Sequence, residues 1–251
     1  MIAFLREVSP SLAACELSFL ERVPIDIERA REQHAHYAAE LSALGCRIEW
    51  LAPLAANADA VFVEDTAVIL PEVAVITRPG VASRRGEIES VAAGLAPLRP
   101  LRRIVAPGTL EGGDVVRIDR NLYVGLSARS NAAGIEQLRL VLAPFGYRVS
   151  GVAMRDCLHL KSACTFIPPG ILLVNPAWVD PKLFDARAVI EVDADEAFAA
   201  NTLTVEGVTL LGAAFPRTER RLQEAGVATR ALDVSELQKA EAALTCMSLL
   251  L

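Results

Sequence analysis

A unit of two strands, a helix and a further strand recurs about five times along this chain, each time over about 45 to 50 residues. A unit of that length cannot bury its apolar face alone, so neighbouring units must pack against one another. Radial repetition meets this requirement. We therefore predict a five-bladed α/β propeller of strand-strand-helix-strand units. An open α/β sheet is the alternative, because the sequence identity between the units is too low to decide.

Short apolar runs bounded by turn residues predict the strands of these units. The expected strands are residues 2–5, 47–51, 60–63, 67–70, 73–77, 104–106, 115–118, 122–125, 148–152, 158–167, 171–174, 188–191, 202–205, 208–211 and 228–232.

Helical periodicity follows Asp26, Ser83 and Asn131, which are residue types that favour the N-cap position. Shorter helical pieces are expected at residues 181–184 and 218–225, and Ser235–Gln238 has the pattern of a capping box. Residues 11–23 show no clear period. We predict that this segment is a loop that moves.

Three separated residues together suit thiol catalysis. Cys246 follows a turn of small residues, His159 is one of only three histidines, and Glu111 precedes two glycines. They would supply a nucleophile, a proton carrier and an acid that orients the imidazole. Taken singly, a buried structural Cys or His is the more common interpretation. A zinc site from Cys157, His159 and Cys246 is a further alternative, although their spacing matches no common ligand pattern.

Composition limits the class of partner. The chain has 251 residues, 53% of them hydrophobic, and a formal net charge of −6. No basic run appears, so we expect no nucleic-acid partner. The N-terminal segment becomes charged too early for a signal peptide, and no apolar run reaches membrane-spanning length, so we expect no membrane partner. The five cysteines show no CxxC spacing, which favours a soluble cytoplasmic protein. We expect a single catalytic domain over residues 1–251.

Six motifs carry polar residues at turns and strand ends, where site residues gather. They are residues 59–66, 78–85, 111–114, 126–131, 158–162 and 244–246. Their order and spacing resembles the dimethylarginine dimethylaminohydrolases of the guanidine-modifying superfamily, from about residue 6 to residue 250. The resemblance implies a five-unit α/β propeller with its site in the central channel. It also implies hydrolysis of Nω-methylated arginines to citrulline plus dimethylamine or methylamine.

The chemistry fits the three residues named above. A guanidinium carbon is a poor electrophile, so a thiolate serves better than a hydroxyl, and Cys246 would form a covalent S-alkylthiouronium. His159 would transfer protons to the departing amine and from the attacking water. Glu111, by resemblance, orients His159 and keeps it basic. No cofactor and no metal is expected.

The resemblance also implies substrate contacts. For the guanidinium, Asp65 is the first choice, with Glu64 and Asp59 beside it, because a buried cation needs carboxylate partners. Arg84 and Arg129 match the positions that bind the substrate carboxylate. The expected substrate-binding residues are Leu17, Asp59, Phe62, Glu64, Asp65, Arg84, Asp114, Arg129, Ala240 and Glu241.

The remaining members of that set have separate expected roles. Leu17 matches a lid over the bound ligand, and Ala240 and Glu241 would offer backbone contacts to the α-amino group. Asp114 has two open interpretations, a substrate contact or a turn cap.

We expect a preference for a methylated substrate because one carboxylate of the related deiminases is missing here. Arginine deiminases of the same superfamily carry His-x-Asp, whereas Lys161 stands at that position here. Met247 follows Cys246 where vertebrate relatives have a second Cys, so the pattern is bacterial in type. The alternatives are an arginine deiminase, a hydrolase for another Nω-substituted arginine, or a non-catalytic binding protein. A homodimer is compatible with such a chain, although no self-complementary patch is visible.

Overall fold

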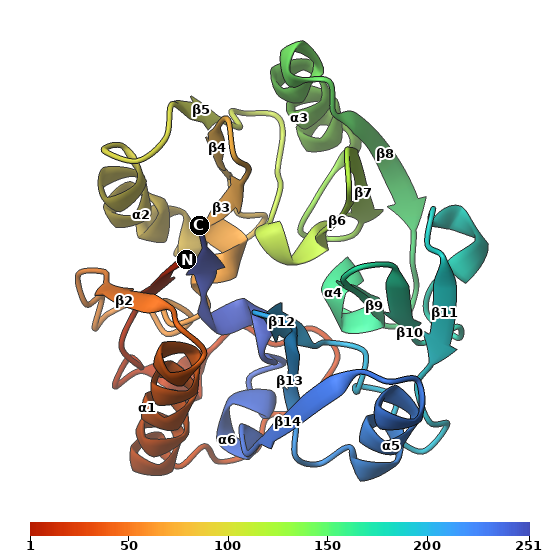
Figure 1. Ribbon diagram of the computed structural model, residues 1–251. Coiled ribbons are helices and arrows are strands. Elements are labelled where there is room, and N and C mark those ends of the chain that lie inside the picture. Colours follow the sequence, from red (N-terminus) through yellow and green to blue (C-terminus); the bar gives the residue numbers. More distant parts are fainter.

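Residues 1–251, all described by the computed structural model, form a ring of five three-stranded sheets around a central axis (Figure 1). The predicted five-bladed α/β propeller is thereby confirmed, and the open sheet is wrong. In every blade the middle strand pairs antiparallel with the inner strand and parallel with the outer strand. A parallel neighbour requires a crossover, which the segment between the second and third strands supplies.

The blades follow the chain order, apart from the first. The sheets are β15-β1-β2, β3-β4-β5, β6-β7-β8, β9-β10-β11 and β12-β13-β14. The strands are β1 (Ile2–Leu5), β2 (Arg47–Trp50), β3 (Ala67–Ile69), β4 (Ala74–Ile76), β5 (Leu101–Arg103), β6 (Val115–Ile118), β7 (Asn121–Leu126), β8 (Arg148–Ala153), β9 (Cys164–Ile167), β10 (Ile171–Val174), β11 (Ala188–Glu191), β12 (Leu203–Val205), β13 (Val208–Gly212), β14 (Ala228–Leu232) and β15 (Leu249–Leu250).

The two ends of the chain close the ring. Strand β15 pairs antiparallel with β1, with Ala3 opposite Leu250 and Phe4 opposite Leu249. The first blade is therefore completed by the last strand, and this pairing fixes where the segment just before β15 lies.

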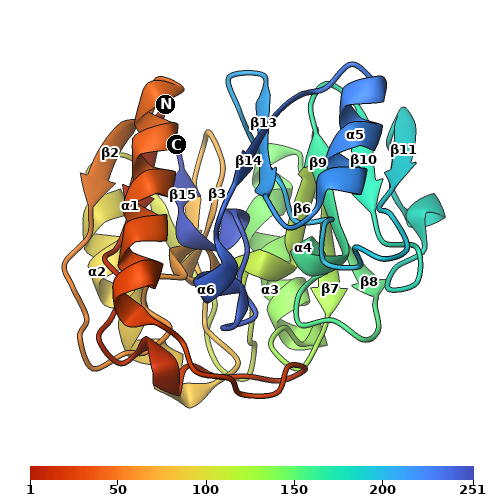
Figure 2. The same cartoon turned by 90° about the horizontal axis from the view of Figure 1, so that it is seen from below.

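The crossover helices lie on the outside of the ring (Figure 2). The crossover helices are α1 (Ile27–Ala43), α2 (Ile88–Leu95), α3 (Ala132–Leu142) and α5 (Pro216–Glu224), whereas the short helices α4 (Leu160–Ala163) and α6 (Ser235–Gln238) lie before β9 and between β14 and β15. The predicted caps of α1 and α3 are confirmed, since Asp26 accepts from the Arg29 N–H and Asn131 accepts from the Gly134 N–H. No helix combines the length and the apolar character needed to cross a membrane.

Several local predictions are wrong. Residues 60 and 61 lie in a turn and Val63 begins a 3-10 helix; residues 60–63 are apolar because all four are buried. The strand expected at 104–106 lies at β5, because its register with β4 pairs Ala74 with Leu101. Ser83 does not cap α2, and Ser235 makes no capping hydrogen bond in α6. In the run 158–167, residues 160–163 form helix α4 and only residues 164–167 form a strand.

His34 on α1 is a core residue: it is only 3% exposed, and its ring lies 5.8 Å from that of Trp50. Burial lowers its pKa to about 4, so it is a neutral core residue at physiological pH.

Candidate active site

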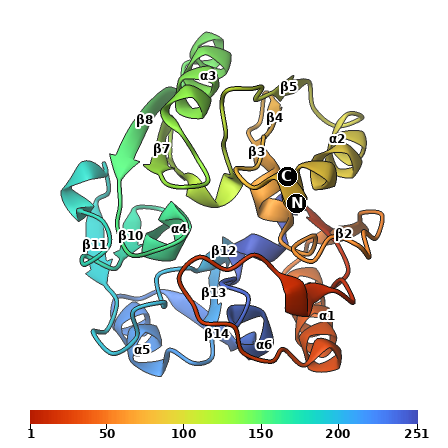
Figure 3. The same ribbon diagram turned by 180° about the vertical axis from the view of Figure 1, so that it is seen from behind.

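A cavity at one mouth of the ring gathers most of the predicted site residues. Its lining consists of Glu16, Asp59, Phe62, Asp65, Arg84, Arg129, Leu158, His159, Ala240, Glu241, Ala242 and Cys246. The segment between β1 and α1 crosses this face of the ring (Figure 3). Cys246 and His159 therefore share one enclosed space, although 87 residues separate them in the sequence.

Cys246 lies in a 3-10 helix, Thr245–Met247, just before the closing strand β15. Two contacts of Thr245 hold this helix: its hydroxyl donates to Glu64 at 2.6 Å and its N–H donates to Asn201 Oδ1 at 3.0 Å. The Cys246 Sγ accepts from the Ala243 N–H at 3.4 Å. Burial, reinforced by the charges of Glu64 and Asp65, raises the pKa of Cys246 to about 12. The thiol of the free protein is therefore neutral.

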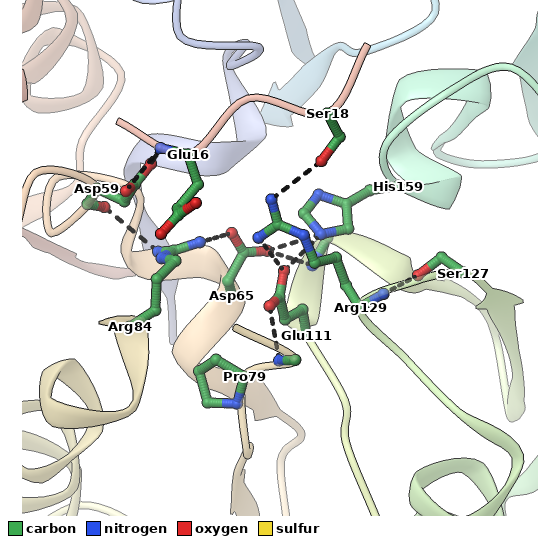
Figure 4. Close-up of polar contacts among 12 residues, drawn as sticks. Glu16, Ser18, Asp59, Asp65, Pro79, Arg84, Glu111, Ser127, Arg129 and His159 are labelled. Carbon is green, nitrogen blue, oxygen red and sulfur yellow. Dashed lines mark hydrogen bonds and ion pairs between the residues drawn. The ribbon is translucent and has the colours of Figure 1, made fainter. Parts of the chain in front are cut away.

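His159 and Glu111 form a buried pair (Figure 4). The imidazole Nε2 lies 2.7 Å from Glu111 Oε2 and 3.9 Å from Asp65 Oδ1. Burial opposes a charge on the ring, but the surrounding carboxylates of Asp65, Asp114 and Glu111 outweigh it and raise the pKa of His159 to about 9. At neutral pH His159 is an imidazolium. Glu111 is fixed on its other oxygen by the Gly80 N–H at 3.0 Å.

Two glycines after Glu111 make this packing possible. A Cβ at Gly112 would overlap the Glu64 carbonyl oxygen, and a Cβ at Gly113 would lie 2.8 Å from both Asp65 Oδ1 and His159 Nδ1. Only a residue without a side chain lets this loop approach so closely.

Asp65 is held in place by its neighbours. Its Oδ2 lies 2.5 Å from Arg84 Nη1 and its Oδ1 accepts from the Gly113 N–H at 3.0 Å. Burial favours the neutral acid, but His159 and Arg84 outweigh it and lower the pKa of Asp65 to about 2. The cavity therefore contains a permanent negative charge beside His159, as a guanidinium ligand requires.

The two expected carboxylate-binding arginines differ in their freedom. Arg84 is buried and donates to Asp65, to the Phe62 carbonyl at 2.8 Å and to Glu87 at 2.9 Å. The Arg129 guanidinium makes only long contacts, 3.4 Å to Ser18 Oγ and 3.6 Å to Glu111. Arg129 is thus the guanidinium with spare donors toward the cavity. A direct contact of Arg84 with a ligand requires that its existing pairs loosen.

The segment of residues 11–23, called the lid segment below, lies over the cavity through several contacts. The Glu16 N–H donates to both Asp59 oxygens, at 3.3 and 3.2 Å. The Glu241 carboxylate accepts the N–H groups of Ser18, Phe19 and Leu20, at distances between 2.5 and 3.0 Å. Glu241 has a φ of 57°, which a non-glycine residue rarely adopts.

Some lid and wall residues were placed differently from expectation. Leu17 packs against the apolar core near β1, whereas its neighbour Glu16 lines the cavity. The sequence interpretation also missed Leu158 and Ala242, which adjoin predicted residues in the chain and could have been found on that ground alone. Glu16 carried no such signal beyond its place in an unpatterned loop.

Glu64 also lies elsewhere than expected. Its carboxylate turns away from the Cys246 cavity and contacts Lys161 Nζ at 2.5 Å and the Thr245 hydroxyl. These residues line a second cavity, which the inner strands of the blades surround. There the Lys161 ammonium donates to one oxygen of Glu64 and the Thr245 hydroxyl to the other, so both oxygens of this carboxylate are paired.

Asp114 lies behind the cavity rather than in its wall. It is completely buried, and its two oxygens accept from the Ser127 hydroxyl at 2.7 Å and from the Leu160 N–H at 3.0 Å. Burial raises its pKa to about 6. These contacts suit a residue that fixes the backbone next to His159.

Three of these side chains lie close enough together to be considered as ligands of a metal cation. Asp65, Glu111 and His159 each offer one ligand atom, and these atoms lie within 4.8 Å of one another. All three already pair with one another or with arginines, and His159 is protonated at neutral pH, which disfavours a metal there.

The ring of blades and the half-buried thiol, buried imidazole and buried carboxylates around one cavity define a guanidine-modifying enzyme of the α/β-propeller class. No family model matches the chain. The N(G),N(G)-dimethylarginine dimethylaminohydrolase of Streptomyces coelicolor is 38% identical over 249 residues, which cover 98% of this chain and 95% of that protein. The chain belongs to the dimethylarginine dimethylaminohydrolase family.

Other relatives agree. The enzyme of the same name from Pseudomonas aeruginosa is 35% identical over 226 residues, or 89% of each chain. A cysteine-to-serine mutant of DDAH from Pseudomonas aeruginosa, complexed with citrulline, has a TM-score of 0.92 at 32% identity and covers 98% of this chain and 97% of its own. A dimethylarginine dimethylaminohydrolase with a histidine-to-glycine mutation, in an adduct with S-methyl-L-thiocitrulline, has a TM-score of 0.93 at 33% identity and covers 98% of both chains.

Proposed function

We propose that this chain hydrolyses Nω-methylated arginines, namely asymmetric dimethylarginine and monomethylarginine, to citrulline plus dimethylamine or methylamine. The observation that carries the proposal is the single cavity shared by Cys246, His159, Asp65 and Arg129. It offers a nucleophile, an acid, a partner for a guanidinium and a partner for a carboxylate. The related enzymes that bind citrulline and S-methyl-L-thiocitrulline support the same substrate class.

The reaction proceeds in two halves. The Cys246 sulfur attacks the guanidine carbon, and the methylated amine leaves with a proton from the His159 imidazolium. The resulting S-alkylthiouronium holds the substrate covalently. The now neutral His159 takes a proton from water, which attacks the same carbon, and the C–S bond breaks to give citrulline and a free thiol.

The thiol must be activated by the substrate itself. With a pKa of about 12, Cys246 is protonated in the free protein. Burial and the acids Glu64 and Asp65 cause this shift. A bound guanidinium cation next to Asp65 offsets those charges, so Cys246 releases its proton to solvent and becomes a thiolate only when substrate is present, while His159 keeps its own proton for the leaving amine.

Lys161 supports the preference for methylated substrates. Its ammonium pairs with Glu64, so the position after His159 and Leu160 presents a paired cation rather than an acid. The second guanidine nitrogen then has no carboxylate to grip it and can carry methyl groups.

Incubation of the purified protein with asymmetric dimethylarginine or monomethylarginine, followed by a citrulline assay, tests the proposal. Citrulline is expected from both compounds, and Cys246→Ser is expected to form none. Acid-quenched wild-type protein should carry the adduct on Cys246 by mass spectrometry; an adduct on Cys157 or Cys164 contradicts the assignment. Comparable turnover of unmodified arginine, with ammonia released, favours the arginine deiminase alternative instead.

Three further features belong to this proposal. Residues 1–251 act as a single catalytic domain, because the cavity takes residues from both ends of the chain. The location is the cytoplasm, which suits five free cysteines. A homodimer is the expected assembly if the chain associates, and light scattering of the purified protein measures it.

A further inference from the structure

The lid segment carries a carboxylate into the cavity. Glu16 lines the same space as Cys246, and Figure 4 places its side chain close to Arg84 and Asp65. None of the six motifs that indicate the family contains this residue. Glu16 is therefore an additional carboxylate that can contact a ligand in this cavity.

The position of Glu16 is fixed on two sides. The Ser83 hydroxyl donates to Oε1 at 2.7 Å, and the backbone N–H is held by both oxygens of Asp59. The other oxygen, Oε2, has no hydrogen-bond partner within the protein. An anchored carboxylate with one free oxygen is ready to accept a hydrogen bond from a ligand.

The charges around Glu16 favour a cation. Asp59 lies beside it and is buried, and both burial and the neighbouring Glu16 charge raise the pKa of Asp59. Arg84, the nearest guanidinium, already donates to Asp65 and Glu87. Two adjacent carboxylates without a dedicated cation lower their mutual repulsion when a positive group comes between them.

An α-amino acid brings such a group to this place. If the substrate guanidinium lies at Asp65 and its carboxylate at Arg129, the ammonium is attached to the same carbon as the carboxylate. Besides Asp65, the cavity lining offers three carboxylates, those of Glu16, Asp59 and Glu241. Asp59 and Glu241 already accept N–H groups of the lid segment, which leaves the free oxygen of Glu16 for the ammonium.

We propose that the Glu16 carboxylate binds the α-ammonium group of the substrate and selects for ligands that carry a free one. This inference rests on the proposed function for the place of the substrate in the cavity. Since the ammonium is remote from the reacting carbon, Glu16 contributes equally to ground-state and transition-state binding. Its loss raises KM and leaves kcat unchanged.

A binding cycle tests the inference independently of turnover. In the Cys246→Ser protein, calorimetry measures the Kd of asymmetric dimethylarginine and of its analogue without the α-amino group, 5-(N′,N′-dimethylguanidino)pentanoate. The same two ligands are then measured after Glu16→Gln is added. We expect Glu16→Gln to weaken dimethylarginine by about five- to tenfold and to leave the analogue within about twofold.

Two variants serve as controls. Glu21→Gln removes the same charge from an exposed side chain of the lid segment that does not line the cavity, and both Kd values should stay at the parent level. Ser83→Ala releases the anchor of Glu16 and should weaken dimethylarginine by about two- to threefold, with no effect once Glu16→Gln is present.

The inference is overturned if Glu16→Gln changes both ligands by the same factor or changes neither. It is also overturned if Glu21→Gln reproduces the effect, because net charge alone then explains it. Failure of the proposed function is seen separately, as a wild-type protein that forms no citrulline, and the ratio of the Kd values still decides the role of Glu16.

Discussion

The pairing of His159 with Glu111 allows a quantitative test by the substitution Glu111→Gln. Glutamine has nearly the same shape, and its amide oxygen still accepts from the Gly80 N–H, which turns its NH2 group toward His159 Nε2; the change therefore removes both the charge and the acceptor that face the imidazolium. The rise of the His159 pKa from 6.5 to about 9 corresponds to roughly 3 kcal/mol in favour of the imidazolium. Asp65 and Asp114 supply part of it. We therefore expect Glu111→Gln to lower the His159 pKa by about 1 to 2 units.

Both kinetics and spectroscopy measure this shift. The basic limb of the kcat profile should move to lower pH by the same 1 to 2 units or so, because the leaving amine needs the protonated ring. The chain has only three histidines, so the His159 imidazole signals can be followed by NMR, with His159→Asn as the assignment control. A His159 titration unchanged by Glu111→Gln would refute the view that this carboxylate keeps the ring charged.

The raised pKa of His159 also predicts how the free energy of unfolding depends on pH. The folded pKa of His159 lies above its unfolded value, so its contribution is fully present below pH 6.5 and is lost as the pH rises through about 9. Glu111→Gln should therefore lower the free energy of unfolding relative to the wild type by roughly 1 to 3 kcal/mol near pH 6. This difference between the two proteins should shrink toward pH 10. A deficit that grows with pH contradicts the argument.

Other substitutions probe the surroundings. Gly113→Ala would place a Cβ 2.8 Å from the His159 ring, so citrulline formation should fall by about 100-fold or more with an unchanged circular dichroism spectrum; normal activity would show that the loop yields. Lys161→Met leaves Glu64 buried without its cation and should cost about 3 to 5 kcal/mol in urea unfolding. Adding Glu64→Gln should restore most of it, and no recovery argues against the pair. Glu241→Gln should speed amide exchange of residues 18–20 by about tenfold, and unchanged exchange would exclude Glu241 as the latch of the lid segment.

Regular segments were predictable because their causes are local. Apolar periodicity with Asp26 and Asn131 as caps placed α1 and α3 correctly. The failures arose where tertiary contacts override local pattern. The 104–106 prediction missed β5 because that strand is exposed and polar, and only its pairing with β4 defines it.

The candidate site divides in the same way. Cys246, His159 and Glu111 could be proposed from their residue types together with the family resemblance of the motifs that contain them, because thiol chemistry on a guanidinium suits that set. Their positions relative to each other could not, since the closing pair β15 and β1 brings the end of the chain beside its start. Glu64 illustrates the limit. A carboxylate next to Asp65 in sequence points the opposite way along a 3-10 helix, and Lys161 holds it there.

By itself, the sequence indicated the repeat, favoured a ring of five units over an open sheet, and determined the chemical kinds of group available. The tertiary structure alone decided which carboxylates face the cavity, that Arg84 is engaged by Asp65 and Glu87, and that Glu16 reaches in from the lid segment. The physical reason is the distance along the chain over which each kind of interaction acts. Periodicity and capping depend on neighbours a few residues apart, whereas the direction of a side chain and its pKa depend on charges from distant segments that only the closed ring brings together.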